Sequence, residues 1–156
     1  TLVPDDVTYR MVVDRASRDD CKNGYVLDGY PRTAVQAGQL EELAKAQKFE
    51  ICAIEVDVPR EELMKRLTGR RSCPVCGEIY NIYSKAPKKE GYCDLHPDAE
   101  LVHRSDDYEA SVLKRLETYD EQTKPLLQYY ENSGRLKKVD GTGEVEEIYQ
   151  AIKELI

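Results

Sequence analysis

Apolar residues recur along the chain at two spacings, and these spacings predict strands that alternate with helices. Three short apolar runs have the length and composition of buried strands: 25–28, 51–58 and 136–140. Apolar residues three or four positions apart predict amphipathic helices at 4–22, 33–48, 60–68, 108–132 and 144–155. Strands that alternate with helices are typical of an α/β fold with a parallel sheet.

Turn and capping residues mark where these helices begin and end. Pro4 opens the first helix, the Asn23-Gly24 pair ends it, and Gly69 ends the third. Pro125 is expected to kink the long helix at 108–132. The inward face of the helix at 33–48 is expected to carry Leu40, Leu43 and Ala44.

The composition is that of a soluble globular domain, with 40% hydrophobic and 34% charged residues among 156. A net charge of −7 argues against a general nucleic-acid binder, because phosphate backbones call for a positive surface. No apolar run is long enough to span a bilayer and no signal-peptide pattern occurs, so we expect a cytoplasmic protein. Five cysteines favour a reducing compartment. Cys52 lies in an apolar run and is expected in the core, whereas Cys21 has no evident partner.

Three of the cysteines belong to a cluster with the spacing of a zinc site. Cys73 and Cys76 form a C-x-x-C pair, and sixteen residues separate them from the C-x-x-H pair of Cys93 and His96. Two chelating turns of this kind predict a tetrahedral site, and four protein ligands leave no open position, so the metal would be structural. The alternative of small buried cysteines is disfavoured by the paired spacing. The fourth ligand stays open, because Asp94 and Asp98 lie near His96.

Several arginines stand at the ends of predicted strands and helices. Arg32 follows the Asp28-Gly-Tyr-Pro turn after the first predicted strand, where ligands bind in parallel sheets. Arg66 and Arg70 are four residues apart at a helix end and share one face. The plainer structural interpretation of Arg32 is an exposed arginine in a turn. For Arg66 and Arg70 it is compensation of the helix dipole.

Five segments occur in the order and spacing of one family: NGYVLDGYPRT, RLTGRR, the four-ligand insert, HRSDD followed by SVLKRL, and KVDGTG. Together they resemble adenylate kinase, in the long form whose lid binds zinc. The resemblance implies a doubly wound parallel sheet, like that of P-loop kinases, with a zinc-ribbon-like lid insertion. The first strand and the G-x-x-x-x-G-K loop of the family do not occur, so we expect an amino-terminally truncated fragment that folds poorly and is inactive alone.

The resemblance also implies the organisation of the chain: 1–69 as the first part of the core, with the end of the AMP-binding segment at 1–17, then a lid at 70–107, then the rest of the core at 108–156. It assigns catalytic roles to Asp28, Arg32, Arg70, Arg104 and Arg115. It assigns ATP binding to Arg66, Arg70, Ile79, Tyr80 and Gly143, and AMP binding to Val3, Gly29, Arg32, Gln36, Arg104 and Arg115.

Two of these assignments compete with plainer interpretations. The resemblance implies that the Gln36 side chain binds the adenine edge of AMP, but Thr33-x-x-Gln36 also fits a helix capping box. Asp28, expected to be buried, resembles the carboxylate that holds magnesium through water. Asp106 and Asp107 would either cap the next helix or orient the phosphate-binding arginines.

The implied reaction is ATP + AMP ⇌ 2 ADP by direct phosphoryl transfer, serving adenine nucleotide homeostasis. It implies ATP, AMP and ADP as ligands, structural Zn²⁺, Mg²⁺ with ATP, and a monomer that binds neither nucleic acid nor membrane. A kinase for UMP or CMP is one alternative. A zinc-ribbon interaction module without catalysis is another, but it leaves the five arginines unexplained.

Overall fold

A computed structural model describes residues 3–156. The chain forms two compact units, Thr1–Glu55 with Thr118–Lys138, and Val56–Glu117 with Val139–Ile156. The helices are α1 Asp5–Ala16, α2 Ala34–Gln47, α3 Arg60–Thr68, α4 Glu109–Thr118, α5 Lys124–Asn132 and α6 Val145–Leu155. The strands are β1 Ala53–Asp57, β2 Arg70–Ser72, β3 Ile79–Asn81 and β4 Leu136–Asp140. Short 3₁₀ turns lie at Asp19–Cys21 and Ser105–Asp107, and a π-helical turn at Tyr119–Thr123.

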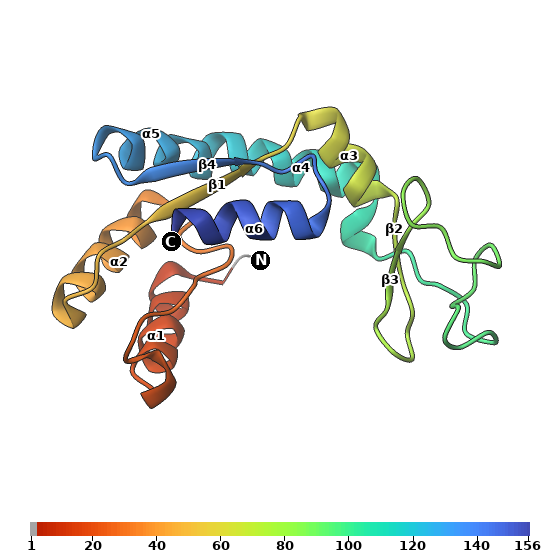
Figure 1. The fold of residues 1–156 in the computed structure, drawn as a ribbon, viewed down its shortest axis with the longest axis horizontal. Coiled ribbons are helices and arrows are strands. Elements are labelled where there is room, and N and C mark those ends of the chain that lie inside the picture. Colours follow the sequence, from red (N-terminus) through yellow and green to blue (C-terminus); the bar gives the residue numbers. More distant parts are fainter. Residues whose placement is uncertain (1–2) are drawn as a thin grey trace. The chain divides into compact units, whose positions relative to one another are not determined.

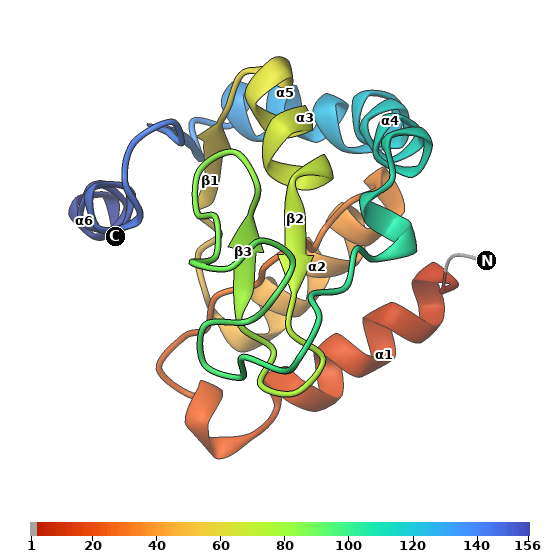
Figure 2. The same cartoon turned by 90° about the vertical axis from the view of Figure 1, so that its right-hand side faces the viewer.

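Strands β1 and β4 pair in parallel, as the α/β pattern predicts, and run side by side in Figure 1. The N–H of Ala53 donates to the Arg135 carbonyl at 2.9 Å, and the N–H of Gly141 donates to the Asp57 carbonyl at 2.8 Å. The bonds advance in the same direction on both strands, which defines a parallel pair. In the insertion between α3 and α4, strands β2 and β3 lie next to each other (Figure 2). They pair antiparallel, with Arg70 opposite Asn81.

The strand predicted at 25–28 is wrong. These residues have no regular structure, Val26 is 86% exposed, and Asp28, expected to be buried, is exposed. A strand needs a neighbour for its backbone groups, and no strand of residues 3–156 pairs with this segment. Side chains hold it instead: the Tyr25 hydroxyl donates to Gln47 Oε1 at 2.8 Å, and the Tyr25 ring meets Phe49 edge-on.

In the first unit, α2 and α5 bury their apolar faces against the start of the parallel pair. Ala37, Leu126 and Tyr130 form a buried cluster, with Ile51, Ala53 and Leu136 packed against it. The predicted inward face of α2 is confirmed, because Leu40, Leu43 and Ala44 are all buried. The prediction that Cys52 lies in the core is wrong: it is exposed, whereas Cys21 is buried.

Most predicted helix boundaries are confirmed to within a residue or two. α3 runs from Arg60 to Thr68, between Pro59 and Gly69. The first helix, however, ends at Ala16, well before the Asn23-Gly24 pair, and a 3₁₀ turn follows it. The long helix predicted at 108–132 is α4 and α5, separated by the π-helical turn just before Pro125. Proline has no N–H to donate to the preceding turn, so the helical hydrogen bonds are interrupted there.

In the second unit, the insertion has a small core of its own. Cys73, Tyr80 and Cys93 are buried together, with Ala99 and Leu101 packed against them. So small a core stabilises an insertion weakly without a further constraint. None of the helices within residues 3–156 combines the length and apolar composition that crossing a membrane requires.

Candidate active site and metal centre

The four predicted metal ligands lie together. One potential ligand atom from each of Cys73, Cys76, Cys93 and His96 falls within 4.8 Å of all the others, a grouping that no other set among residues 3–156 shares. Nδ1 of His96 is buried and has no hydrogen-bond partner within the described chain, as expected of a nitrogen that binds a metal. The alternative ligand Asp94 is engaged elsewhere, because its carboxylate accepts the Lys88 N–H at 2.8 Å.

The surroundings of Cys93 favour a thiolate, which is the form that binds zinc. At Cys76 a backbone hydrogen bond from Glu78 lowers the thiol pKa, but burial and hydrogen bonds with Cys73 and Cys93 outweigh it and raise the pKa. The N–H of Val75 points at Cys73 Sγ, 3.4 Å away. Burial of the Cys93 thiol opposes its ionisation, but hydrogen bonds from the Tyr80 hydroxyl and from the backbone of Leu95 and His96 lower its pKa to about 6. The grouping of the four side chains and the low pKa of the Cys93 thiol therefore fit a closed Cys₃His zinc site.

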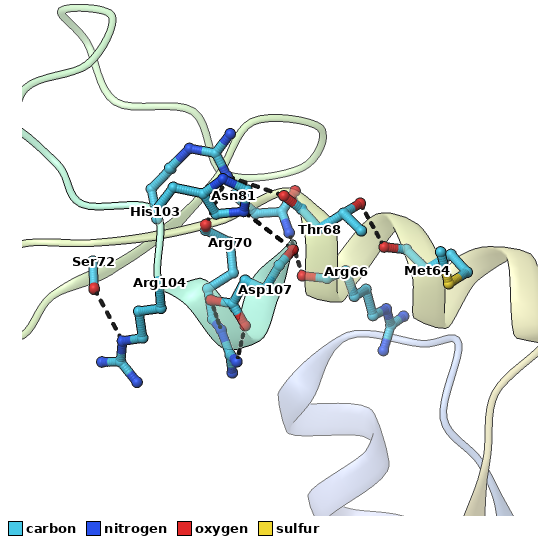
Figure 3. A network of polar contacts seen from close by, with 10 residues as sticks. Met64, Arg66, Thr68, Arg70, Ser72, Asn81, His103, Arg104 and Asp107 are labelled. Atoms are coloured by element: carbon cyan, nitrogen blue, oxygen red, sulfur yellow. Dashed lines mark hydrogen bonds and ion pairs between the residues drawn. The ribbon is translucent and has the colours of Figure 1, made fainter. Parts of the chain in front are cut away.

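Arg70, at the start of β2, is held by a buried carboxylate. Its Nε donates to Asp107 Oδ2 at 2.9 Å, and Nη2 forms a second, short bond to Oδ1 (Figure 3). Asp107 is fully buried, and the Arg70 guanidinium holds the pKa of its carboxyl below the usual range. The two parallel bonds fix the plane of the guanidinium.

Arg104 joins the same cluster through Ser72. Residues two apart on a strand share a face, so Ser72 lies on the side of β2 that carries Arg70. Arg104 Nε donates to Ser72 Oγ at 3.2 Å, and the Arg104 carbonyl accepts the Asp107 N–H at 3.0 Å. Paired backbone hydrogen bonds between Ser72 and Val102 close the base of the insertion. One strand and one 3₁₀ turn thus bring Arg70 and Arg104 together.

Arg66, near the end of α3, reaches the loop after β4. Its Nη1 donates to the Gly141 carbonyl at 2.8 Å and its Nη2 to the Thr142 carbonyl at 3.5 Å, while its Nε donates to Glu62 at 3.1 Å. The structure therefore places Arg66 beside the Gly141-Thr142-Gly143 loop. The resemblance assigns ATP binding to both of these parts of the chain.

In the first unit, the Gly29–Gln36 segment is tightly bonded. Arg32 Nε donates to the Gly29 carbonyl at 2.7 Å. Gly29 has φ +70°, a conformation that residues with a Cβ rarely adopt, so this turn favours glycine. Thr33 Oγ1 accepts the Gln36 N–H, as in a capping box, but Gln36 Oε1 accepts the Arg32 N–H instead of the Thr33 N–H.

The comparisons with known proteins agree with this arrangement. A model of the family described as adenylate kinase matches residues 1–135. An adenylate kinase of Thermodesulfovibrio yellowstonii is 47% identical over 152 residues, which are 97% of this chain and 70% of that protein. One of Clostridium acetobutylicum is 46% identical over 156 residues, covering 99% of this chain and 72% of that protein, and one of Caldanaerobacter subterraneus is also 46% identical, covering 99% and 70%.

The chain belongs to the adenylate kinase family. Its chemistry is accordingly that of a nucleoside monophosphate kinase, the reversible transfer of a phosphoryl group from MgATP to AMP. The family predicted from the motifs is confirmed, and so is the α/β fold class. The two alternatives, a UMP or CMP kinase and a non-catalytic zinc ribbon, find no support in these matches.

Some adenylate kinase positions lie in surroundings that the sequence did not indicate. Tyr80 turns its ring into the core beside the metal cluster, so any contact with ATP would run through its backbone; Ile79 is 41% exposed. Arg115 is exposed on α4. Val3 lines an open pocket of about 830 Å³ in the first unit, together with Asp5 and Thr33.

Sequence reasoning missed three side chains that hold others in place. Asp5 accepts hydrogen bonds from the Gln36 amide at 2.7 Å and from Thr33 Oγ1 at 3.1 Å, and Ser72 accepts from Arg104. Tyr80 bonds to Cys93. The sequence around Asp5 indicated only the start of a helix. Ser72 and Arg104, and likewise Tyr80 and Cys93, are far apart in the chain, so no local pattern could reveal their contacts.

Proposed function

We propose that the arginines of this chain hold the nucleotide phosphates during the reaction ATP + AMP ⇌ 2 ADP. In this reaction an oxygen of the AMP phosphate attacks the γ-phosphorus of ATP as the bond to the β-γ bridging oxygen breaks. The reacting groups need positive charge and in-line alignment more than covalent assistance. The observation that carries the proposal is that two of the three guanidinium nitrogens of Arg70 are bonded to the buried carboxylate of Asp107, in the turn that begins at Arg104.

Arg70 and Arg104 are the proposed phosphate-binding residues of the lid, at 70–107, and Arg115 contributes from α4. Asp107 acts as a positioning residue, because its carboxylate faces Arg70 and not solvent. A guanidinium held in this way has already lost much of its side-chain entropy before substrate binds. Asp106 is exposed and does not form this ion pair, so the orienting role is proposed for Asp107.

The adenine of ATP is proposed to bind against the Arg66 guanidinium and the Gly143 segment, with Ile79 and Tyr80 offering backbone. A planar guanidinium suits stacking on a base. Arg66 is already tied to this loop by the Gly141 carbonyl. In the first unit, Arg32 is proposed to bind the AMP phosphate, with AMP contacts from Val3, Gly29 and Gln36.

Gln36 must change partners to bind adenine. Its amide is bonded to Asp5 and to the Arg32 backbone, and the residue is 7% exposed. Asp28, which is exposed at the turn before Arg32, is the proposed carboxylate for the magnesium that accompanies ATP. Bound Mg²⁺ would neutralise phosphate charge as the phosphoryl group moves.

The lid is proposed to hold a structural zinc ion through Cys73, Cys76, Cys93 and His96. Four protein ligands leave no site for water or substrate, so zinc would stabilise the insertion and would not take part in phosphoryl transfer. We further propose that the protein acts as a monomer in the cytoplasm, with core segments at 1–69 and 108–156.

A comparison of phosphoryl acceptors tests the proposed reaction and its specificity for AMP. The complete gene product is incubated with MgATP and with AMP, UMP or CMP in turn, and nucleoside diphosphate formation is followed by chromatography. We expect ADP from AMP at a kcat/KM at least about tenfold above that of the pyrimidine nucleotides. Preferred use of UMP or CMP would overturn the adenine assignment, and no transfer to any acceptor would overturn the proposed activity.

A further inference from the structure

Tyr80 joins two parts of the metal cluster through one hydroxyl group. The side chain comes from β3, and the residue is 4% exposed. Its oxygen lies 3.6 Å from Cys93 Sγ and accepts the backbone N–H of Asp94 at 2.9 Å. The sulfur and the backbone immediately after it are therefore held by the same atom.

The direction of these bonds follows from the available donors. A backbone N–H can only donate, so the hydroxyl oxygen is the acceptor in its bond with Asp94. The hydroxyl proton then needs an acceptor of its own, because the group is buried. Cys93 Sγ is the acceptor that lies within reach. The geometry thus gives an O–H···S bond directed at a sulfur atom of the Cys₃His set.

A bond of this kind matters most when the sulfur carries charge. Three thiolates on one Zn²⁺ leave an excess of negative charge in the cluster, and Cys93 is 2% exposed, so water has little access to its sulfur. Cys76, in contrast, is exposed and can be solvated directly. The two buried ligands, Cys73 and Cys93, therefore depend on protein donors: the Val75 N–H for Cys73, and for Cys93 a set of donors that includes the Tyr80 hydroxyl.

We propose that Tyr80 is a positioning residue of the metal centre, whose hydroxyl orients the Cys93 thiolate and slows loss of the metal from the lid. This inference rests on the proposed zinc site. It gives Tyr80 a role distinct from nucleotide binding. Outer hydrogen-bond partners of metal ligands typically change metal affinity by about 10- to 100-fold when removed.

Metal transfer to a chromophoric chelator tests the proposal. The complete gene product is loaded with one Zn²⁺ per chain, and release to 4-(2-pyridylazo)resorcinol is followed by absorbance. Tyr80→Phe keeps the buried ring and removes only the hydroxyl, and we expect it to release zinc about tenfold faster. Tyr83→Phe is the matched control, because Tyr83 is 63% exposed and follows the same strand; it should release zinc at the wild-type rate.

Cobalt(II) in place of zinc gives a readout that packing alone would not change. A hydrogen bond lowers the energy of the sulfur lone pairs, so Tyr80→Phe should shift the sulfur-to-cobalt charge-transfer band to longer wavelength. Site-specific 3-fluorotyrosine at position 80, whose hydroxyl is a stronger hydrogen-bond donor, should shift the band to shorter wavelength. This comparison tests the role of the hydroxyl even if Tyr80→Phe does not fold. Failure of the wild-type chain to take up metal would reject the zinc site itself. Stable binding with equal release rates and no opposite shifts would reject only the role of Tyr80.

Discussion

At the scale of single residues, the clearest constraint is the ion pair between Arg70 and Asp107. Asp107 is fully buried and its carboxyl pKa is held below the usual range, chiefly by the Arg70 hydrogen bonds. An unpaired buried carboxylate would be costly, so each partner depends on the other for its position. The stability of the fold and the position of the proposed phosphate-binding arginine therefore depend on the same contact.

Asp107→Asn should lower the free energy of unfolding by about 2–4 kcal/mol at pH 7, because it leaves the Arg70 guanidinium without its anion. The folded carboxyl has a depressed pKa, so its stabilisation is present above the unfolded pKa of about 4 and is lost as pH falls through the folded value. The difference between variant and wild type in urea unfolding should therefore shrink below about pH 4.

Asp106→Asn is the control for this measurement. Asp106 is exposed, so its replacement should change the free energy of unfolding by less than about 0.5 kcal/mol. Equal losses for both variants would mean that general negative charge, and not the Arg70 pair, stabilises the turn.

Arg70→Ala should reduce kcat of the complete gene product by on the order of 100-fold, because phosphate-binding arginines act mainly on the transition state. Arg18→Ala removes an arginine whose side chain is 63% exposed and paired with Asp14, and should leave kcat unchanged. Steady-state assays with ATP and AMP give both values. An unchanged kcat for Arg70→Ala would assign this side chain to the stability of the lid alone.

At the scale of elements, close packing restricts which residue can occupy position 141 in the loop after β4. A Cβ on Gly141 would lie 2.5 Å from a methyl group of Val58 and 2.7 Å from one of Val56, so the loop approaches β1 too closely for a side chain. The same residue offers its carbonyl to Arg66. The glycine thus connects the parallel strand pair to the proposed adenine-binding segment.

Gly141→Ala should destabilise the chain by about 1–3 kcal/mol, because the new methyl group overpacks the contact with β1. Gly38→Ala, within α2, is its counterpart: nothing lies within 4 Å of the added Cβ, so the helix should gain about 0.5–1 kcal/mol. Chemical denaturation of the two variants checks both signs. A stabilised Gly141→Ala variant would show that the loop moves freely away from β1.

At the scale of the whole molecule, the chain divides into two compact units, and only the second contains the proposed metal site. The insertion in that unit has few buried apolar residues, so its order is expected to depend on the metal. Stability and catalysis should then respond differently when metal is removed.

Chelation of zinc should lower the melting temperature of the chain by on the order of 10 °C, because it removes the main constraint on the insertion. Turnover of the still-folded complete gene product, assayed well below that temperature, should change little. Calorimetry and a coupled ADP assay provide the two values. A large loss of turnover with the fold intact would indicate a catalytic metal.

Much of the molecule could be predicted from sequence, for local reasons. Pro59 and Gly69 delimit α3, the apolar spacing of α2 identifies its buried face, and the C-x-x-C and C-x-x-H pairs locate the metal cluster. Each of these signals acts within one or two turns of chain. The motif order likewise predicted the family.

Strand pairing, burial and side-chain contacts between residues far apart in the chain could be determined only from the tertiary structure. An apolar run at 25–28 has strand composition but pairs with no strand of the described residues 3–156. Cys52 is exposed although it lies in a run that looks uniformly buried. The bonds of Arg70 to Asp107 and of Tyr80 to Cys93 join residues 37 and 13 positions apart. Sequence alone determines periodicity, turns and chelating pairs because these are short-range; pairing and burial are long-range, so only the folded chain determines them.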